Sequence, residues 1–215
     1  MDVVVAGGHG KIGLRLLRLL ASGGHRARGI IRKPEQEADL RDAGAEAIVL
    51  DLENAEPDEV ARAIEGADAA VFAAGAGPGS GPERKWTVDY GAAAKLIEAC
   101  KQNGIARYVI VSSVGADNPE AAGEGGFRVY LDAKHKADEE LIASGLDYTI
   151  VRPHGLTDDP GTGRVEVGQK LERGEVPRDD VAAVLLACLE HDNTIGKAFE
   201  LKSGETPIEE AIASL

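Results

Sequence analysis

The chain has 215 residues, 43% of them hydrophobic, which is enough for one well-buried core and would leave a second independent domain cramped. Its 37 acidic and 24 basic residues give a formal net charge of −13. This charge repels nucleic-acid backbones and anionic lipid surfaces, so we expect neither as a partner. The acidic exterior favours a solvated, soluble protein, and adaptation to high salt is the alternative.

Short apolar runs rich in Val and Ile alternate with longer amphipathic stretches along most of the chain. Buried strands separated by helices are what a parallel sheet covered on both faces requires. The alternation therefore predicts an α/β fold of three layers, a doubly wound parallel sheet of the Rossmann type. The expected strands are 2–7, 26–31, 46–50, 67–75, 107–113 and 147–153. The expected helices are 11–22, 35–44, 57–66, 85–104 and 130–145.

Beyond Pro153 the rhythm loosens into a short extension, which we expect on the substrate side of the sheet. It contains a loop with a short strand, a helix from about 178 to 190 and a late strand at 197–204. Two segments rich in Gly, 75–85 and 115–128, are candidates for mobile segments over a site. With no linker between these parts, we expect a single domain over residues 1–215.

Cysteine usage and the start of the chain indicate the compartment. Cys100 and Cys188 lie in apolar helical patterns without a CxxC motif, which predicts buried thiols in a reducing cytoplasm. The stretch MDVVVAGGHG lacks the features of a secretion signal, and no apolar run approaches membrane-spanning length. The five histidines are scattered without the spacing of metal ligands, so no metal site is expected. We expect a cytoplasmic monomer or homodimer.

A glycine-rich loop joins the first strand to the first helix in AGGHGKIG. Gly7, Gly10 and Gly13 form GxxGxxG, while Gly8 replaces Gly7 in the overlapping GxGxxG. Such glycines allow a tight turn, the close approach of a pyrophosphate and a close helix contact, and the helix N-terminus favours the negative charge. At the first crossover of a β-α series, the motif predicts dinucleotide binding. The expected cofactor contacts in this loop are Gly7, His9, Gly10, Lys11, Ile12 and Gly13.

The end of the second expected strand indicates which dinucleotide is bound. NAD binders offer a carboxylate to the ribose 2′-hydroxyl here, whereas this chain has Arg32 and Lys33. A 2′-phosphate requires cations, and a guanidinium holds it by two hydrogen bonds. NADP is therefore favoured, and Glu35 nearby keeps NAD as the alternative.

Two further strand ends are expected to contact the nucleotide. Asp51 and Leu52 follow the third strand, where such sheets meet the adenine. Ala73, Ala74 and Gly75 follow the fourth, where small residues let the backbone pass beside the ribose. Simple capping and turn roles are the alternative for both sets.

A tyrosine and a lysine four residues apart, in YLDAK, head the expected helix 130–145. This spacing lets Tyr130 and Lys134 share one side of the helix. A free phenol ionises only near about pH 10, but an ammonium at about 4 Å would favour its phenolate by ~4 kcal/mol at an effective dielectric near 20. The pair could therefore transfer protons, and the alternative is a half-buried tyrosine beside a solvated lysine.

With its glycine loop, VSS after the fifth strand, YLDAK, and VRP after the sixth, the sequence resembles the short-chain dehydrogenase/reductase superfamily over nearly its whole length. Within it, the chain is similar to NAD(P)-dependent sugar epimerases, to NmrA-like proteins and to biliverdin-reductase-type flavin reductases. The resemblance implies a catalytic set of Ser113, Tyr130 and Lys134, with Ser112 as the alternative serine. Tyr130 would pass a proton to or from the substrate oxygen that Ser113 holds. The cofactor contacts implied at this end are Ser112, Tyr130, Lys134 and Pro153.

Some features depart from these relatives. Asp89 stands where many of these relatives have an asparagine. Only about sixty residues follow VRP, which leaves little chain to form the walls of a site for a nucleotide sugar. A small carbonyl, quinone or flavin-like substrate would fit more easily than a bulky sugar, with His154, Asp158 and Asp159 contributing to the wall. The function expected is an NADP-dependent oxidoreductase or epimerase. The alternative is an NmrA-like redox sensor that binds NAD(P) without turnover.

Overall fold

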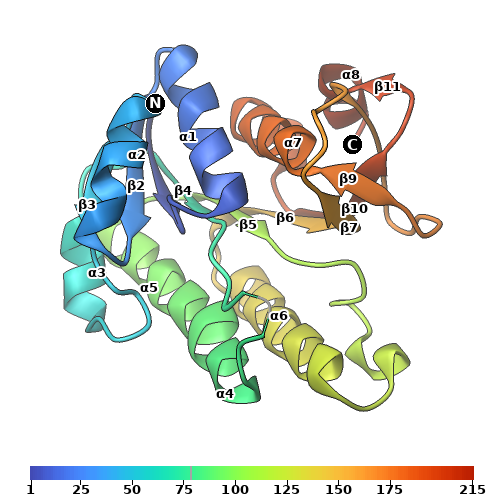
Figure 1. Cartoon of the computed structure of the whole chain (residues 1–215), viewed down its shortest axis with the longest axis horizontal. Helices are drawn as coiled ribbons and strands as arrows, with labels where there is room; N and C mark the ends of the chain where they lie inside the picture. Colours follow the sequence, from blue (N-terminus) through green and yellow to red (C-terminus); the bar gives the residue numbers. More distant parts are fainter. Residues whose placement is uncertain (78) are drawn as a thin grey trace.

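The structure is a computed structural model that describes residues 1–77 and 79–215. Residue 78, which belongs to the segment 75–85 considered above, lies outside the described residues. Within them, a nine-stranded sheet runs in the order β11-β8-β10-β6-β5-β4-β1-β2-β3 (Figure 1). Neighbouring strands from β10 to β3 pair in parallel. This order reverses between β1 and β4, where open sheets of this kind bind ligands.

The parallel strands are β1 (Asp2–Ala6), β2 (Arg26–Ile31), β3 (Glu46–Val49), β4 (Ala69–Phe72), β5 (Arg107–Val111), β6 (Asp147–Pro153) and β10 (Lys197–Ser203). The edge strands are β8 (Arg164–Gly168) and β11 (Thr206–Pro207), and a small second sheet pairs β7 (Gly155–Thr157) with β9 (Glu175–Pro177). The α-helices are α1 (Lys11–Ser22), α2 (Glu37–Asp42), α3 (Pro57–Ala63), α4 (Pro82–Arg84), α5 (Ala93–Asn103), α6 (Gly126–Ala143), α7 (Arg178–Glu190) and α8 (Ile208–Ala213). Short 3₁₀ turns occur at η1 (Pro34–Gln36), η3 (Pro119–Ala122) and η4 (Asp192–Thr194), and η2 (Lys85–Ala92) is a π-helix.

The sheet is buried on both faces, as the continuous apolar strands require. Along β1, Val3 and Val5 belong to one core cluster, while Val4 and Ala6 belong to the other. Because successive strand residues point to opposite faces, these clusters are the two layers of the core. The first is covered by α1, α2, α7 and α8, and the second by α3, α5 and α6 (Figure 1). The predicted three-layer Rossmann fold is confirmed.

The structure differs from the expected elements in three places. The sheet is not parallel throughout, because β8 pairs antiparallel with both β10 and β11. The expected helix 85–104 begins as the π-helix η2 and becomes α-helical only at α5. Helix α6 begins at Gly126 rather than at Tyr130, so the tyrosine lies in the second turn and not at the helix start.

Among the described residues, no helix is long and apolar enough to cross a membrane.

Both cysteines are buried, as expected from their apolar surroundings. Burial raises the pKa of each thiol to about 12, which keeps it protonated at neutral pH. We expect iodoacetamide to leave Cys100 and Cys188 unmodified in the native protein and to alkylate both in guanidinium chloride. Mass spectrometry of the intact chain measures this, and rapid modification of the native protein would contradict the buried positions.

Candidate active site

The glycine loop is shaped by contacts that leave no room for side chains. Gly7 has φ +80°, and a Cβ there would lie 2.7 Å from the Cα of Ala74. A Cβ on Gly13 would lie 2.3 Å from the Gly7 carbonyl oxygen, which accepts a hydrogen bond from the Gly10 N–H at 2.8 Å. These approaches hold a tight turn against the N-terminus of α1, as a phosphate cradle requires. Of the two candidates for the first glycine of the motif, Gly7 has the left-handed conformation and Gly8 does not.

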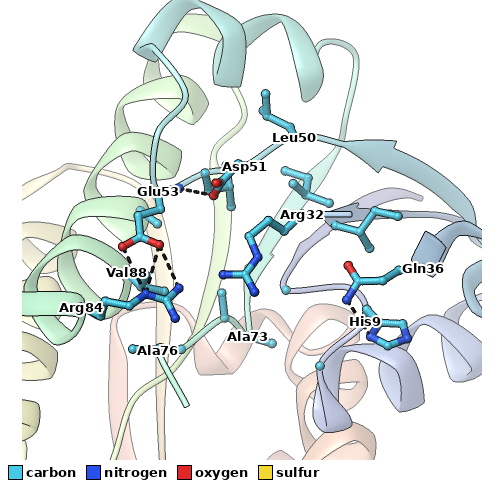
Figure 2. A pocket seen from close by; sticks show the side chains of 18 residues that line it. His9, Arg32, Gln36, Leu50, Asp51, Glu53, Ala73, Ala76, Arg84 and Val88 are labelled. Atoms are coloured by element: carbon cyan, nitrogen blue, oxygen red, sulfur yellow. Dashed lines mark hydrogen bonds and ion pairs between the residues drawn. The ribbon is translucent and has the colours of Figure 1, made fainter. Parts of the chain in front are cut away.

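A pocket of about 290 Å³ opens beside this loop at the carboxyl ends of β1 to β4 (Figure 2). We call it the cofactor pocket, after the prediction that these residues contact the dinucleotide. The predicted contacts that line it are Gly7, His9, Gly10, Arg32, Asp51, Leu52, Ala73, Ala74 and Gly75. Further residues that line it are Ile30, Ile31, Gln36, Leu50, Glu53, Ala76, Arg84, Val88 and Ala92. The glycine loop and the predicted strand ends thus meet around one hollow.

Four predicted loop or strand-end contacts do not line this pocket. Gly13 packs against the backbone of Gly7 and Gly8. Ile12 is buried in the core. The Lys11 ammonium pairs with Asp158 of the carboxy-terminal extension. Lys33 is exposed and uses its backbone N–H to contact the Gln36 side chain at 3.2 Å.

Arg32, unlike Lys33, lines the cofactor pocket. Its side chain extends into the cofactor pocket (Figure 2), and it forms no hydrogen bond or ion pair with any residue in 1–77 or 79–215. Glu35, the carboxylate that kept NAD open, does not line the pocket. The two carboxylates that do, Asp51 and Glu53, accept hydrogen bonds from protein groups. Arg32 is therefore a cation in the pocket that is not committed to a protein carboxylate.

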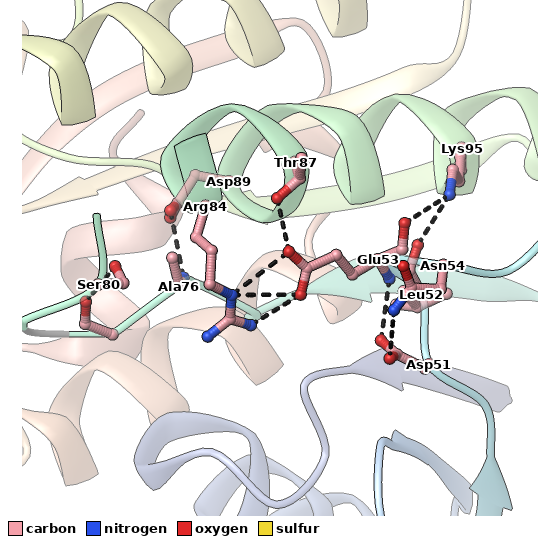
Figure 3. A network of polar contacts seen from close by, with 11 residues as sticks. Asp51, Leu52, Glu53, Asn54, Ala76, Ser80, Arg84, Thr87, Asp89 and Lys95 are labelled. Carbon is pink, nitrogen blue, oxygen red and sulfur yellow. Dashed lines mark hydrogen bonds and ion pairs between the residues drawn. The ribbon is translucent and has the colours of Figure 1, made fainter. Parts of the chain in front are cut away.

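A polar network closes the far side of the cofactor pocket (Figure 3). Arg84 donates to Glu53 at 2.8 Å, and the Thr87 hydroxyl donates to the same carboxylate at 2.6 Å. The bonds from Arg84 and then from Thr87 lower the pKa of Glu53. The Lys95 ammonium donates to the carbonyl oxygens of Leu52, Glu53 and Ala55 at 2.8 to 3.1 Å. The loop after β3 is thereby fixed to η2 and α5.

The predicted catalytic lysine is buried and doubly held. Lys134 is 3% exposed, and its Nζ donates to the Val111 carbonyl oxygen at 3.0 Å. The same Nζ lies 3.5 Å from Oδ1 of Asp89, which is itself 2% exposed. The other Asp89 oxygen accepts the Ala76 N–H at 3.1 Å. Asp89 therefore forms an ion pair with Lys134 that also fixes the backbone at the edge of the cofactor pocket.

Tyr130 is half-buried one helical turn before this lysine, with the Lys134 Nζ 6.0 Å from its ring centroid. The Lys85 Nζ approaches the ring to 5.3 Å, and the Phe127 ring centroid lies 5.9 Å away. From the sequence, only the charge of Lys134 was expected to act on the Tyr130 phenol. The structure adds a carboxylate, Asp89, that compensates this charge and a second cation, Lys85, that reinforces it.

The two candidate serines differ in their partners. The Ser112 hydroxyl donates to Oδ2 of Asp138 at 2.9 Å, and Arg152 donates to the same oxygen at 3.1 Å. Burial raises the pKa of Asp138, although Arg152 and Ser112 oppose this shift. The Ser113 hydroxyl makes only a local bond to the adjacent Val114 carbonyl at 3.2 Å. Ser113 is therefore the serine whose hydroxyl is available to another acceptor.

The π-helix positions the groups around Tyr130. Lys85 and Asp89 are both in η2, and its wider turn lets Lys85 contact the Tyr130 ring while Asp89 contacts Lys134. π-Helical turns are rare and frequently occur at functional sites. The amino-acid pattern gave no signal for this turn, because the apolar spacing of 85–104 fits an ordinary helix.

A second pocket, of about 890 Å³, is lined by residues of the segments 114–131, 154–155 and 170–175, together with Glu200. We call it the extension pocket. Val114 and Leu131, which line it, directly follow Ser113 and Tyr130 in the sequence. The predicted wall residue His154 lines it, whereas Asp158 pairs with Lys11 and Arg178 instead. Ser113, Tyr130 and Lys134 themselves line neither pocket. Lys134 is linked to the cofactor pocket through Asp89, which accepts the N–H of the lining residue Ala76.

Comparison with known proteins identifies the family. The family model described as NAD(P)H-binding matches residues 7–192. An uncharacterised sugar epimerase, YhfK, from Bacillus subtilis is 46% identical over the full length of both chains. A solved structure of a candidate NAD-dependent epimerase/dehydratase from Bacillus halodurans superimposes with a TM-score of 0.93 at 39% identity, covering 100% of both chains. An anaerobilin reductase from Escherichia coli O157:H7, ChuY, superimposes with a TM-score of 0.78 at 26% identity, over 94% of this chain and 97% of that one.

The matched region includes the glycine loop, the strand ends of the cofactor pocket and the tyrosine-lysine helix. The chain therefore belongs to the NAD(P)H-binding family of Rossmann-fold proteins that resemble epimerases and reductases.

Proposed function

We propose that this protein is an NADP-dependent reductase of a small carbonyl compound, acting through Ser113, Tyr130 and Lys134 on a single domain of residues 1–215. The observation that carries the proposal is the buried Lys134, held by Val111 and Asp89 beside Tyr130, between residues that line the cofactor pocket and the extension pocket. A buried ion pair costs desolvation and is weak evidence for stability. Asp89 connects the pair to Ala76 in the lining of the cofactor pocket, and this position suits a functional role.

Each residue of the set has a separate role in the proposed reaction. A bound nicotinamide supplies the hydride. Ser113 donates a hydrogen bond to the substrate carbonyl oxygen, which fixes its position. Tyr130 gives its phenolic proton to this oxygen as negative charge develops there. Lys134 stabilises the phenolate that remains, and Asp89 holds Lys134 in place.

Arg32 is the proposed ligand of the 2′-phosphate of NADP. It lines the cofactor pocket without a protein partner among the described residues, while the carboxylate that would favour NAD, Glu35, lies outside the lining. A guanidinium binds phosphate through paired, charge-assisted hydrogen bonds. The glycine turn supports a pyrophosphate of the same cofactor at the N-terminus of α1. A Cβ at Gly7 or Gly13 would collide with neighbouring backbone and open this tight turn.

We expect Arg32→Ala to weaken NADPH binding by roughly 10- to 100-fold, because hydrogen bonds to a charged group contribute about 1.5–3 kcal/mol. NADH binding should change by less than about twofold. Titration of coenzyme fluorescence measures both constants. Lys33→Ala is the matched control, since that side chain lies outside the pocket and should leave both constants unchanged. Equal losses for the two coenzymes would reject the role of Arg32.

An epimerase is the second candidate, favoured by the descriptions of two of the similar proteins. An epimerase keeps its nicotinamide through the cycle, whereas a reductase exchanges it at every turnover. The absorbance spectrum of the purified protein distinguishes them. Nucleotide that remains bound through purification supports the epimerase, and nucleotide that exchanges freely supports the reductase. A redox sensor would exchange nucleotide but show no turnover with any carbonyl substrate.

A further inference from the structure

A buried carboxylate with an unused oxygen lies in the wall of the extension pocket. Glu200, on β10, is 1% exposed and lines this pocket. Its Oε2 accepts the Leu171 N–H at 2.8 Å and contacts Nε2 of His154 at 3.1 Å. Its Oε1 is buried without a hydrogen-bond partner among the described residues. A buried acceptor in this state loses its hydration without replacement, so it calls for an explanation.

The neighbours of Glu200 fix which of its oxygens remains available. The Gly174 N–H donates to Nδ1 of His154 at 3.2 Å, so in the neutral ring the proton lies on Nε2 and is donated to Oε2 of Glu200. Oε2 therefore serves two donors, His154 and Leu171. The Lys170 ammonium lies 3.5 Å from Oε1, but its side chain is 72% exposed and can move into solvent.

The rest of the wall combines apolar and charged residues. Val114, Ala121, Phe127, Leu131 and Leu171 form its apolar part, and Asn118, Lys170, Arg173 and Glu175 its polar part. A buried polar atom beside an apolar surface fixes the orientation of a ligand and selects for a complementary group. An oxygen that only accepts selects for an O–H or N–H donor.

We propose that Glu200 is a specificity-determining residue of the extension pocket and selects partly apolar carbonyl compounds that carry a hydroxyl or N–H donor away from the reacting carbonyl. The donor bonds to Oε1 of Glu200. Because these compounds would be substrates of the proposed reductase, this inference rests on the proposed function. Binding of the donor group requires only the extension pocket and Glu200.

Three probes test the inference, two of nearly equal shape and one that is longer by a methyl group. These are para-(hydroxymethyl)benzaldehyde, which carries a donor, para-(methoxymethyl)benzaldehyde, which carries only an acceptor, and para-ethylbenzaldehyde, which carries neither. Binding to the full chain is followed by the amide signals of Leu171 and Gly174 in nitrogen–proton correlation spectra, with and without NADP⁺. We expect the hydroxymethyl compound to bind about tenfold more tightly than the other two, with a millimolar dissociation constant.

Glu200→Gln should change the preference in a specific way. Both Leu171 and His154 require an acceptor, so the amide oxygen takes the Oε2 position and the NH₂ group takes the position of Oε1. The acceptor probe should then gain about tenfold over the ethyl probe and equal the hydroxymethyl probe. Glu175→Gln is the matched control, because Glu175 lines the same pocket but is exposed and should leave the order unchanged.

The outcomes separate this inference from the proposed function. Equal binding of the three probes, or no signal change with any of them, overturns the role of Glu200. Coenzyme fluorescence with NADPH measures turnover of the same compounds. A preference for the donor probe without turnover supports the specificity role of Glu200 and contradicts only the reductase function. Turnover without such a preference supports the reductase function and rejects the role of Glu200.

Discussion

Replacing Tyr130 by Phe is expected to lower NADPH-dependent carbonyl reduction by roughly 10²- to 10⁴-fold, the usual contribution of a general acid. The substitution removes only the phenolic oxygen, and the ring keeps its contacts with Phe127 and Lys85. The dissociation constant of NADPH should therefore stay nearly unchanged. The rate of reduction is measured from initial rates with a carbonyl compound that the wild type reduces. The dissociation constant is measured by a fluorescence titration with NADPH.

Tyr148→Phe is the matched control for this variant. Tyr148 lies on β6, and its hydroxyl makes no hydrogen bond to residues 1–77 or 79–215, so the same chemical change should leave the rate within about twofold of the wild type. Full activity of Tyr130→Phe would end the proposed role of the phenol. A loss of rate and NADPH affinity together would indicate a role in binding instead.

The framework of the fold was predictable because it depends on local patterns. A run such as DVVVA can be buried on both faces only inside a covered sheet, and Val3 and Val4 indeed pack in opposite layers. At the edge of the sheet, the sequence predicted a short strand in the segment that contains β8 and none at β11. Both strands pair antiparallel through contacts between distant segments, such as Val165 with Ser203, which residue periodicity does not encode.

The cofactor pocket was predictable where the backbone determines the contact. Gly7 and Gly10 line it because a β-α crossover of this kind brings its loop to the sheet edge. Side-chain directions were not predictable in the same way. Arg32 enters the pocket while Lys33 does not, since successive residues at a strand end point to opposite faces.

The residues that sequence reasoning missed act through partners far along the chain. Arg84 lines the cofactor pocket because Glu53, 31 residues earlier, holds its guanidinium. Glu200 meets His154 across 46 residues of sequence. Neither pair stands in a motif, and only the folded sheet brings its members together. Asp89 was noted from the sequence only for its position, and neither its pairing with Lys134 nor the π-helix that contains it was indicated by a pattern.

Lys134→Met is expected to destabilise the protein by about 3–5 kcal/mol as well as to inactivate it. The substitution leaves Asp89 as a buried charge without its counter-ion, and breaking a buried pair from one side has this typical cost. For a chain of this size, the midpoint of thermal unfolding should fall by about 10 °C. Calorimetry measures the shift. Lys136→Met, on the exposed side of the same helix, should change the stability by less than about 0.5 kcal/mol.

The double variant Asp89→Asn/Lys134→Met separates stability from catalysis. A neutral asparagine still accepts the Ala76 N–H and leaves no uncompensated charge, so most of the lost stability should return. The activity should not return, because the group that stabilises the phenolate of Tyr130 is still absent. If the refolded double variant reduced carbonyls at the wild-type rate, Lys134 would be only a structural partner of Asp89. If Lys134→Met unfolded at the wild-type temperature, the expected destabilisation from leaving Asp89 without its partner would be rejected.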